Sequence, residues 1–262
     1  MQRIMQFVFS TILSLACLAS AMAADTPALT QVGVIDALLA GGYEGAMSIE
    51  RVRALGDIGL GTFDALDGEM VVLDGRVHQV LASGAVVIPP DSLTTPFAQV
   101  ARMGAQAAFP LEPGLDLEGL GRRLDAVLGD ANVFAAARVD GRFASLSARS
   151  VPRQSPPYRP LAEVAKEQTL FRFQAVEGTL VGLRGPAYAK GLGVPGWHWH
   201  FLTRDRTRGG HVLSCVLDAT ARPQARVSAL RRFVLVLPDK GLSGFDLGRD
   251  RSGELHSVEA PQ

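Results

Sequence analysis

The chain has 262 residues, with 26 Lys and Arg balanced by 26 Asp and Glu, and 47% of its residues are hydrophobic. This length supports one large domain or two small packed lobes around a sizeable core, and the composition excludes disulfide-stapled miniproteins and disordered chains. Zero net charge leaves no broad basic surface, so we expect no nucleic-acid partner and favour a small molecule instead.

Residues 1–23 have the layout of a secretory signal peptide. Arg3 precedes an uncharged apolar stretch, and the small residues at 21–23 form a cleavage site near Ala23. We therefore expect an exported protein, periplasmic or secreted, without stable membrane association after cleavage. An uncleaved anchor and a lipoprotein attached at Cys17 are the alternatives, and polar residues within the stretch argue against the anchor.

Local patterns in the first half predict a sheet with helices packed against it. Apolar residues at helical spacing, followed by glycine, predict short helices at 34–40 and 48–56, and Asp116 can cap a longer amphipathic helix. Asp74-Gly75 and Asp140-Gly141 each predict a β-hairpin, because Asp-Gly tolerates the positive φ angles of a tight turn.

The segment 151–160 contains four prolines, which cannot join a sheet ladder or a helix interior. We place a boundary there, between an N-terminal lobe at 24–150 and a C-terminal lobe at 151–262. Beyond it, the pattern predicts a short helix at 161–168 and strands at 170–176, 179–184 and 232–237.

The expected fold class is therefore α/β of the α+β kind, with two packed lobes that form one catalytic unit. The N-terminal lobe is expected to hold a mixed β-sheet with helices. The C-terminal lobe is expected to hold a mostly antiparallel, barrel-like sheet that carries the metal site described next.

Three of the five histidines lie close together, at His198, His200 and His211. On a strand, His198 and His200 share one face, while the intervening aromatic residues share the other. The glycine-rich stretch 203–210 can turn the chain back and place His211 beside His200 on an antiparallel partner. Three neutral imidazoles would then leave open positions on a metal such as zinc, one ion per chain. The alternative is a hairpin of hydrogen-bonded imidazoles that binds no metal.

The remaining cysteine and histidines are interpreted as structural or surface residues. In a regular strand Cys215 shares a face with His211, but about 13 Å of strand rise places it too far away to bind the same ion. We interpret Cys215 as a small buried hydrophobe, and signal cleavage leaves it without a disulfide partner. His78 and His256 lie singly among polar residues and are interpreted as surface residues.

The segment 186–213, which contains all three clustered histidines, resembles the metal-binding signature of bacterial α-acetolactate decarboxylases. Residues 59–69 are similar to an N-terminal motif of that family, and residues 149–158 are similar to its central arginine motif. The three motifs occur in the family's order, and the resemblance covers nearly the whole mature chain.

The resemblance implies a carboxy-lyase that converts 2-acetolactate (2-hydroxy-2-methyl-3-oxobutanoate) to acetoin and CO2, with zinc held by the three histidines. It implies that Thr62, Glu69 and Arg149 lie on the substrate side, together with a glutamate of the C-terminal tail. Glu259 is the preferred tail residue and Glu254 the alternative. The partner is then a small 2-hydroxy-3-oxo acid, and a homodimer is compatible with the sequence.

These residue types suit the decarboxylation of a β-keto acid. Loss of CO2 leaves an electron pair, and a metal with neutral ligands keeps its full charge to stabilise the developing oxyanion. Arg149 offers a planar fork that can hold the substrate carboxylate with the breaking bond perpendicular to the carbonyl plane. Glu69, with a tail glutamate, can then supply the proton that completes the product.

Two other functions stay open at this point. A cupin-like metal oxygenase or isomerase also uses His-x-His on a β-barrel, but its expected glutamate is absent and Asp205 stands at the wrong spacing. A non-enzymatic exported module that binds a metal or ligand would explain the histidines, but it assigns nothing to Arg149 or Glu69.

Overall fold

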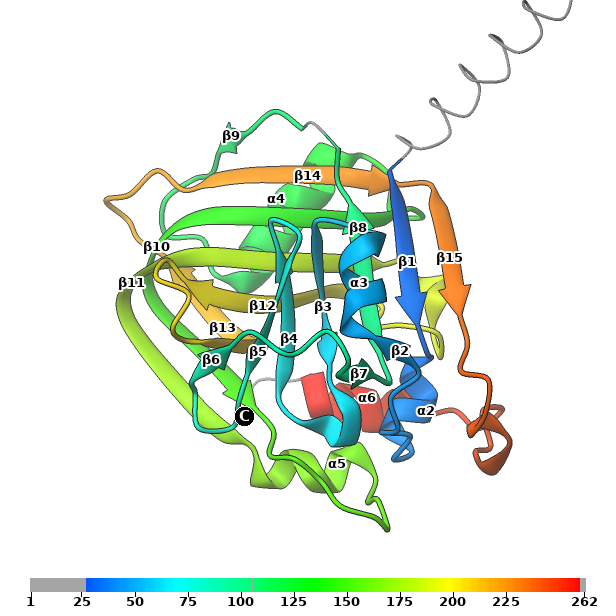
Figure 1. Ribbon diagram of the computed structural model, residues 1–262. Coiled ribbons are helices and arrows are strands. Elements are labelled where there is room, and N and C mark those ends of the chain that lie inside the picture. Colours follow the sequence, from blue (N-terminus) through cyan, green and yellow to red (C-terminus); the bar gives the residue numbers. More distant parts are fainter. Residues whose placement is uncertain (1–26, 105, 260–262) are drawn as a thin grey trace, which may run out of the picture.

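The computed structural model describes residues 27–104 and 106–259, so the expected signal peptide lies outside the described residues. Two large β-sheets face each other with few helices around them, which confirms the α+β fold class (Figure 1). Apolar residues of both sheets, among them Leu60 and Leu183, form one shared buried cluster. Among the described helices, none combines the length and the apolar character that crossing a membrane requires.

The first sheet is mixed, as expected. Its strand order is β15 (Arg232–Val236), β1 (Ala28–Val32), β8 (Ala98–Arg102), β3 (Ile58–Thr62), β4 (Glu69–Leu73), β5 (Arg76–Val80) and β6 (Val86–Val87). β1 and β15 are parallel, and the other neighbours are antiparallel. A separate short pair joins β2 (Met47–Ser48) to β7 (Thr94–Thr95).

The second sheet is antiparallel and barrel-like. Its order is β11 (Thr169–Gly185), β12 (Gly196–Thr203), β13 (Gly209–Leu217), β10 (Phe134–Ser150), β14 (Gln224–Leu230) and β9 (Phe109–Pro110). Because β10 also pairs with β11, strands β10 to β13 close into a ring, from which β14 and β9 extend. One residue from each ring strand illustrates the apolar cluster inside it: Leu146, Leu180, Phe201 and Cys215.

The expected helices are present. They are α2 (Ile35–Leu39), α3 (Ile49–Leu55), α4 (Leu117–Leu128) and α5 (Leu161–Val164), and a further helix, α6 (Ser252–Glu259), lies near the C-terminus. Short 3-10 turns occupy Asp64–Leu66, Ala165–Glu167, Ala187–Ala189 and Leu242–Gly244. Asp116 caps α4 as predicted, because its Oδ1 accepts a hydrogen bond of 2.7 Å from the Gly119 amide.

The two Asp-Gly pairs behave differently. Asp74 and Gly75 have positive φ angles and connect β4 to β5, which confirms the first hairpin. The second hairpin is wrong, because β10 runs straight through Asp140 and Gly141 and pairs there with β11. A Cβ at Gly141 would lie 2.8 Å from the Pro223 side chain, so this glycine permits a close approach rather than a turn.

The strands predicted separately at 170–176 and 179–184 are one long strand, β11, which bends at Ala175, where φ is 49°.

The proline-rich segment also does not divide the sheets. β10 precedes it and belongs to the second sheet, whereas β15 follows it and joins the first. The two halves of the chain therefore exchange strands, because local hydrophobic patterns do not specify the sheet that a strand enters.

Candidate metal centre

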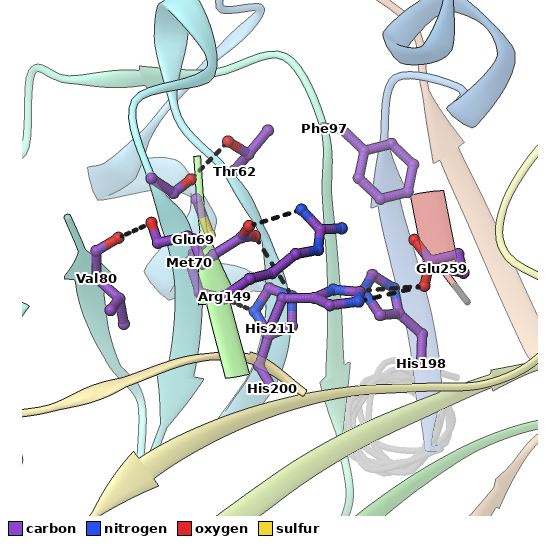
Figure 2. Close-up of polar contacts among 12 residues, drawn as sticks. Thr62, Glu69, Met70, Val80, Phe97, Arg149, His198, His200, His211 and Glu259 are labelled. Carbon is purple, nitrogen blue, oxygen red and sulfur yellow. Dashed lines mark hydrogen bonds and ion pairs between the residues drawn. The ribbon is translucent and has the colours of Figure 1, made fainter. Parts of the chain in front are cut away.

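The three clustered histidines meet in the space between the two sheets (Figure 2). His200 of β12 is directly opposite His211 of β13, as predicted from the turn between them. One potential ligand atom from each of His198, His200 and His211 lies within 4.8 Å of the others. All three side chains are buried, so the cluster is a convergent set of imidazoles shielded from solvent.

The backbone aims these imidazoles by strand alternation and by a β-bulge. Trp199 and Phe201 point into the ring of β10 to β13, opposite to the histidines, as expected. In β13, the pairing with β10 slips by one residue at Leu213. Consequently His211 and Cys215 do not share a face, which corrects the expectation for a regular strand. Cys215 is buried in the apolar cluster, as predicted, and burial raises the pKa of its thiol to about 12.

The protonation of the histidines favours metal binding. His200 Nδ1 lies 2.7 Å from the Met70 carbonyl, an acceptor, so this nitrogen carries the proton and donates it. His200 Nε2 is then a lone pair, buried with no hydrogen-bond partner among the described residues. Burial lowers the pKa of His198 to about 3 and holds those of His200 and His211 well below their usual value. His198 Nε2 and His211 Nδ1 lie 3.0 Å apart and share a hydrogen bond, which a bound ion would replace. Three neutral imidazoles are the ligand set that a borderline divalent cation prefers.

Arg149 of β10 is directly opposite His211 and is 4% exposed. Its Nη1 lies 3.4 Å from Oε1 of Glu69, and its Nη2 lies 3.4 Å from the Val258 carbonyl. Its Nε is buried with no hydrogen-bond partner among the described residues. The guanidinium is thus held in place by long contacts and keeps donor capacity for an anionic ligand.

The first sheet supplies the carboxylate and the hydroxyl predicted on the substrate side. Glu69 begins β4, and its Oε2 lies 3.6 Å from His200 Nε2. Thr62 is directly opposite Glu69 in the ladder, and its hydroxyl donates to the Gly68 carbonyl at 2.7 Å. The two sheets therefore contribute different parts of the site, the second the imidazoles and Arg149, the first Glu69 and Thr62.

The structure separates the two candidate glutamates of the tail. Glu259, in the last turn of α6, places its Oε2 3.6 Å from His211 Nε2 and 3.9 Å from His198 Nε2. Glu254 lies in the first turn of the same helix and pairs instead with Arg249 and Arg251, at 3.0 and 3.3 Å. Only Glu259 joins the histidines.

Both carboxyl groups at the centre hold protons more tightly than usual. Burial raises the pKa of Glu69 to about 7, with Arg149 opposing the rise and Glu259 adding to it. Burial also raises the pKa of Glu259 to about 7, again opposed by Arg149. Near neutral pH such groups can both give and accept a proton, which suits general acid and base chemistry.

These groups surround a small cavity of about 40 Å³. Its polar lining consists of the three histidines, Thr62, Glu69, Arg149 and Glu259. The rest of its wall is mainly apolar and comes from several segments of the chain, with Ile35, Leu38, Leu66, Phe97, Val151, Leu161 and Val258. Sequence reasoning missed this apolar wall, because its residues belong to no common motif and carry no signal beyond hydrophobicity.

The two isolated histidines differ. His256 is exposed, as predicted. His78 is 6% exposed, so its interpretation as a surface residue is wrong. It lies on β5 opposite Val71, in a strand with both faces covered, and burial lowers its pKa. Neither histidine joins the metal centre.

Comparisons with known proteins find relatives that cover most of the chain. Residues 29–242 match the model of the family named alpha-acetolactate decarboxylase. The chain is 42% identical over 232 residues to such an enzyme from Methanosarcina mazei, covering 88% of this chain and 80% of that protein. It is 36% identical to the enzyme from Brevibacillus brevis, over 88% of this chain and 81% of that protein. The crystal structure of alpha-acetolactate decarboxylase from Bacillus subtilis strain 168 superposes with a TM-score of 0.84 and 30% identity, over 88% of this chain and 99% of that one.

Proposed function

The chain belongs to the α-acetolactate decarboxylase family, and from this premise we propose that it converts 2-acetolactate to acetoin and CO2 with a zinc ion at the three histidines. One observation carries the proposal. Three neutral imidazoles, the guanidinium of Arg149 and the carboxyl groups of Glu69 and Glu259 line a single buried cavity. Among the described residues, these histidines are the one group of His, Cys, Asp or Glu side chains that could hold a metal ion.

The residues fit the proposed zinc. His200 Nε2 is an orphaned buried lone pair, and the second nitrogen of that ring is anchored to the Met70 carbonyl, as metal-binding histidines usually are. When bound, zinc supplies a Lewis acid that polarises the substrate's oxygens and accepts the electron density released with CO2. His198, His200 and His211 would hold it without diluting its charge, because no carboxylate is needed to complete the set.

Arg149 is proposed to orient the substrate. Its guanidinium faces the same cavity as the histidines, and its contacts with Glu69 and Val258 are long enough to be exchanged for a substrate carboxylate. A planar fork fixes the carboxylate so that the breaking C–C bond stands perpendicular to the ketone plane. Loose rather than ideal pairing also suits the reaction, because the carboxylate must leave as CO2.

Glu69 and Glu259 are proposed to manage the proton. Loss of CO2 leaves a carbon that must gain a proton to give acetoin, and a carboxyl Oε–H is the donor at hand. Glu69 lies beside His200, whereas Glu259 lies beside His198 and His211. The two carboxyl groups therefore flank the histidine cluster at different places, so delivery by one of them would set the configuration of the new C–H centre.

A cupin-like enzyme would need a carboxylate ligand a few residues after the second histidine, and Asp205 is the carboxylate nearest to that position. Asp205 takes no part in the site. It lies in the β12–β13 turn, where it accepts hydrogen bonds from Thr203 and Thr207. A module that only binds a metal would also leave the buried Arg149 and the carboxyl groups of Glu69 and Glu259 without a role. These observations support the decarboxylase over both alternatives.

The test uses purified mature protein and acetolactate, with CO2 and acetoin measured before chelation, after chelation and after zinc is restored. We expect turnover to vanish with the metal and to return with zinc. Activity that survives complete removal of the metal would refute the proposed mechanism.

We also propose that the protein is exported, supported by the layout of residues 1–23. The measurement is the N-terminal sequence of protein recovered from the periplasm or medium, which should begin near residue 24. Recovery of the uncleaved chain from the cytoplasm alone would contradict export.

A further inference from the structure

The strands that carry the histidines separate at the metal centre. β12 and β13 pair over three residues only, from His200–His211 to Leu202–Gly209. The half of β12 before His200 is bonded to β11, and the half of β13 after His211 is bonded to β10. The wall of the strand ring is therefore forked, and the histidine cluster lies at the base of the fork.

A cleft of about 620 Å³ lies at this fork. β12 contributes Trp197 and Trp199 to its lining, and β13 contributes Ser214 and Val216, both exposed. Helix α4 forms a further side, where Gly121 allows the Trp197 ring to approach closely. The cleft is large enough for a small metabolite, whereas the cavity at the metal centre is not.

The two spaces share a wall. His198 and Glu259 line both the cleft and the 40 Å³ cavity. That cavity has room for about three water molecules, whereas acetolactate has five carbons and four oxygens. The site must therefore widen before the substrate can bind, and the wall that it shares with the larger cleft is a place where it can do so.

Glu259 is the part of this wall that can move. His198 lies within a paired strand and is 7% exposed. Glu259 lies in the last turn of α6, and its side chain is 22% exposed. Its contacts with the imidazoles, at 3.6 and 3.9 Å, are longer than hydrogen bonds, so rotation of the side chain breaks no strong interaction.

We propose that the substrate enters the metal cavity, and the product leaves it, through the cleft between β12 and β13, with the side chain of Glu259 as the movable wall. The identification of acetolactate and acetoin as the molecules that pass through the cleft rests on the proposed function. The route itself does not, because it is argued from the cleft and the wall that it shares with the metal cavity, which do not depend on the molecule that passes.

The test fills the cleft without touching the catalytic groups. Ser214→Trp places a bulky ring in the cleft near the histidines, and Val216→Trp places one farther out. Ser214→Ala is the matched control without bulk, and Gln174→Trp adds the same ring on an exposed position of β11 away from the cleft. Zinc content and circular dichroism establish that each variant is folded and loaded.

Two rates are measured on the zinc-loaded proteins. One is the second-order rate constant for zinc removal by pyridine-2,6-dicarboxylate, an anion comparable in size to the substrate. The other is kcat/KM for acetolactate. We expect Ser214→Trp to lower both by roughly tenfold or more and Val216→Trp to lower them less, while both controls stay within about twofold of the unmodified protein.

The possible outcomes distinguish a failure of the proposed route from a failure of the proposed function. If Ser214→Trp slows zinc removal although no form of the protein turns over acetolactate, the route stands and the proposed function fails. If loaded Ser214→Trp loses zinc at the normal rate, the route is wrong, whatever happens to turnover. Equal slowing by Gln174→Trp would also overturn it, because bulk outside the cleft should not matter.

Discussion

Replacing Gly182 by alanine should damage both stability and the metal centre. Gly182 of β11 is directly opposite Trp199 of β12. A Cβ at this position would lie 2.1 Å from Cζ3 and 2.4 Å from Cε3 of the indole. Carbon atoms in contact prefer about 3.5–4.0 Å, so the strand or the ring must shift by more than about 1 Å.

The indole has little room to move. Trp199 is 3% exposed and stacks on Trp197 with ring centroids 5.0 Å apart. Overpacking of this kind costs about 1–3 kcal/mol of unfolding free energy, and an overlap with a fixed ring favours the upper end. Because Trp199 lies between His198 and His200 in β12, the shift should also weaken zinc binding by roughly 10- to 100-fold.

Urea unfolding of the metal-free protein measures the first effect, and competition with a chromophoric chelator measures the second. Trp199→Phe should relieve the clash, so the double variant should lose less stability than the sum of the single variants. Gly253→Ala is the control, because a Cβ there meets no atom within 4 Å. Unchanged stability and zinc affinity in Gly182→Ala would refute the reasoning, as would strict additivity in the double variant.

Three further predictions follow from the site and the core. Glu69→Gln should retain zinc but lower kcat/KM by about 10²- to 10⁴-fold, because it removes a proton donor. Near-normal acetoin production at full zinc content would show that Glu69 is not the proton donor. Glu259→Gln should lose activity on a similar scale while Glu254→Gln should not, because the Glu254 carboxylate pairs with Arg249 and Arg251; comparable losses in the two variants would contradict the assignment. Burial lowers the pKa of His78 in the folded protein, so the unfolded chain binds the additional proton, and His78 lowers stability as pH drops below about 6.5, by at most about 1.4 kcal/mol per pH unit in addition to the effect of the clustered histidines. His78→Gln should flatten this acid-side slope in urea titrations of the metal-free protein, and an unchanged slope would exclude His78 as a contributor.

The histidine cluster was predictable because it depends on local geometry. Alternation along a strand places His198 and His200 on one face whatever surrounds them, and a short turn suffices to bring back His211. The bulge at Leu213 was not predictable, since it reflects how β13 adapts to β10. It changed the relation of Cys215 to His211 but not the histidine cluster itself.

Other parts of the fold depended on distant partners. Asp74-Gly75 and Asp140-Gly141 carry the same local signal, yet only the first is a turn, because β11 and Pro223 hold the second in a continuous strand. Likewise, the sequence favoured Glu259 over Glu254 but left both as candidates, because it does not show how α6 packs. Packing of Val258 against the cluster that includes Leu161 brings Glu259, rather than Glu254, to the imidazoles.

The parallel pairing of β1 with β15 has a consequence for the order of folding. These neighbours come from opposite ends of the described chain, so the first sheet cannot be completed until almost all of the chain is available. Until then, β1 is the exposed edge of an incomplete sheet, open to pairing with other chains. Contacts of such long sequence separation slow folding, and we expect refolding to be slow and prone to aggregation at high protein concentration. A chain truncated before residue 232 should therefore associate through β1, even though it retains all three clustered histidines.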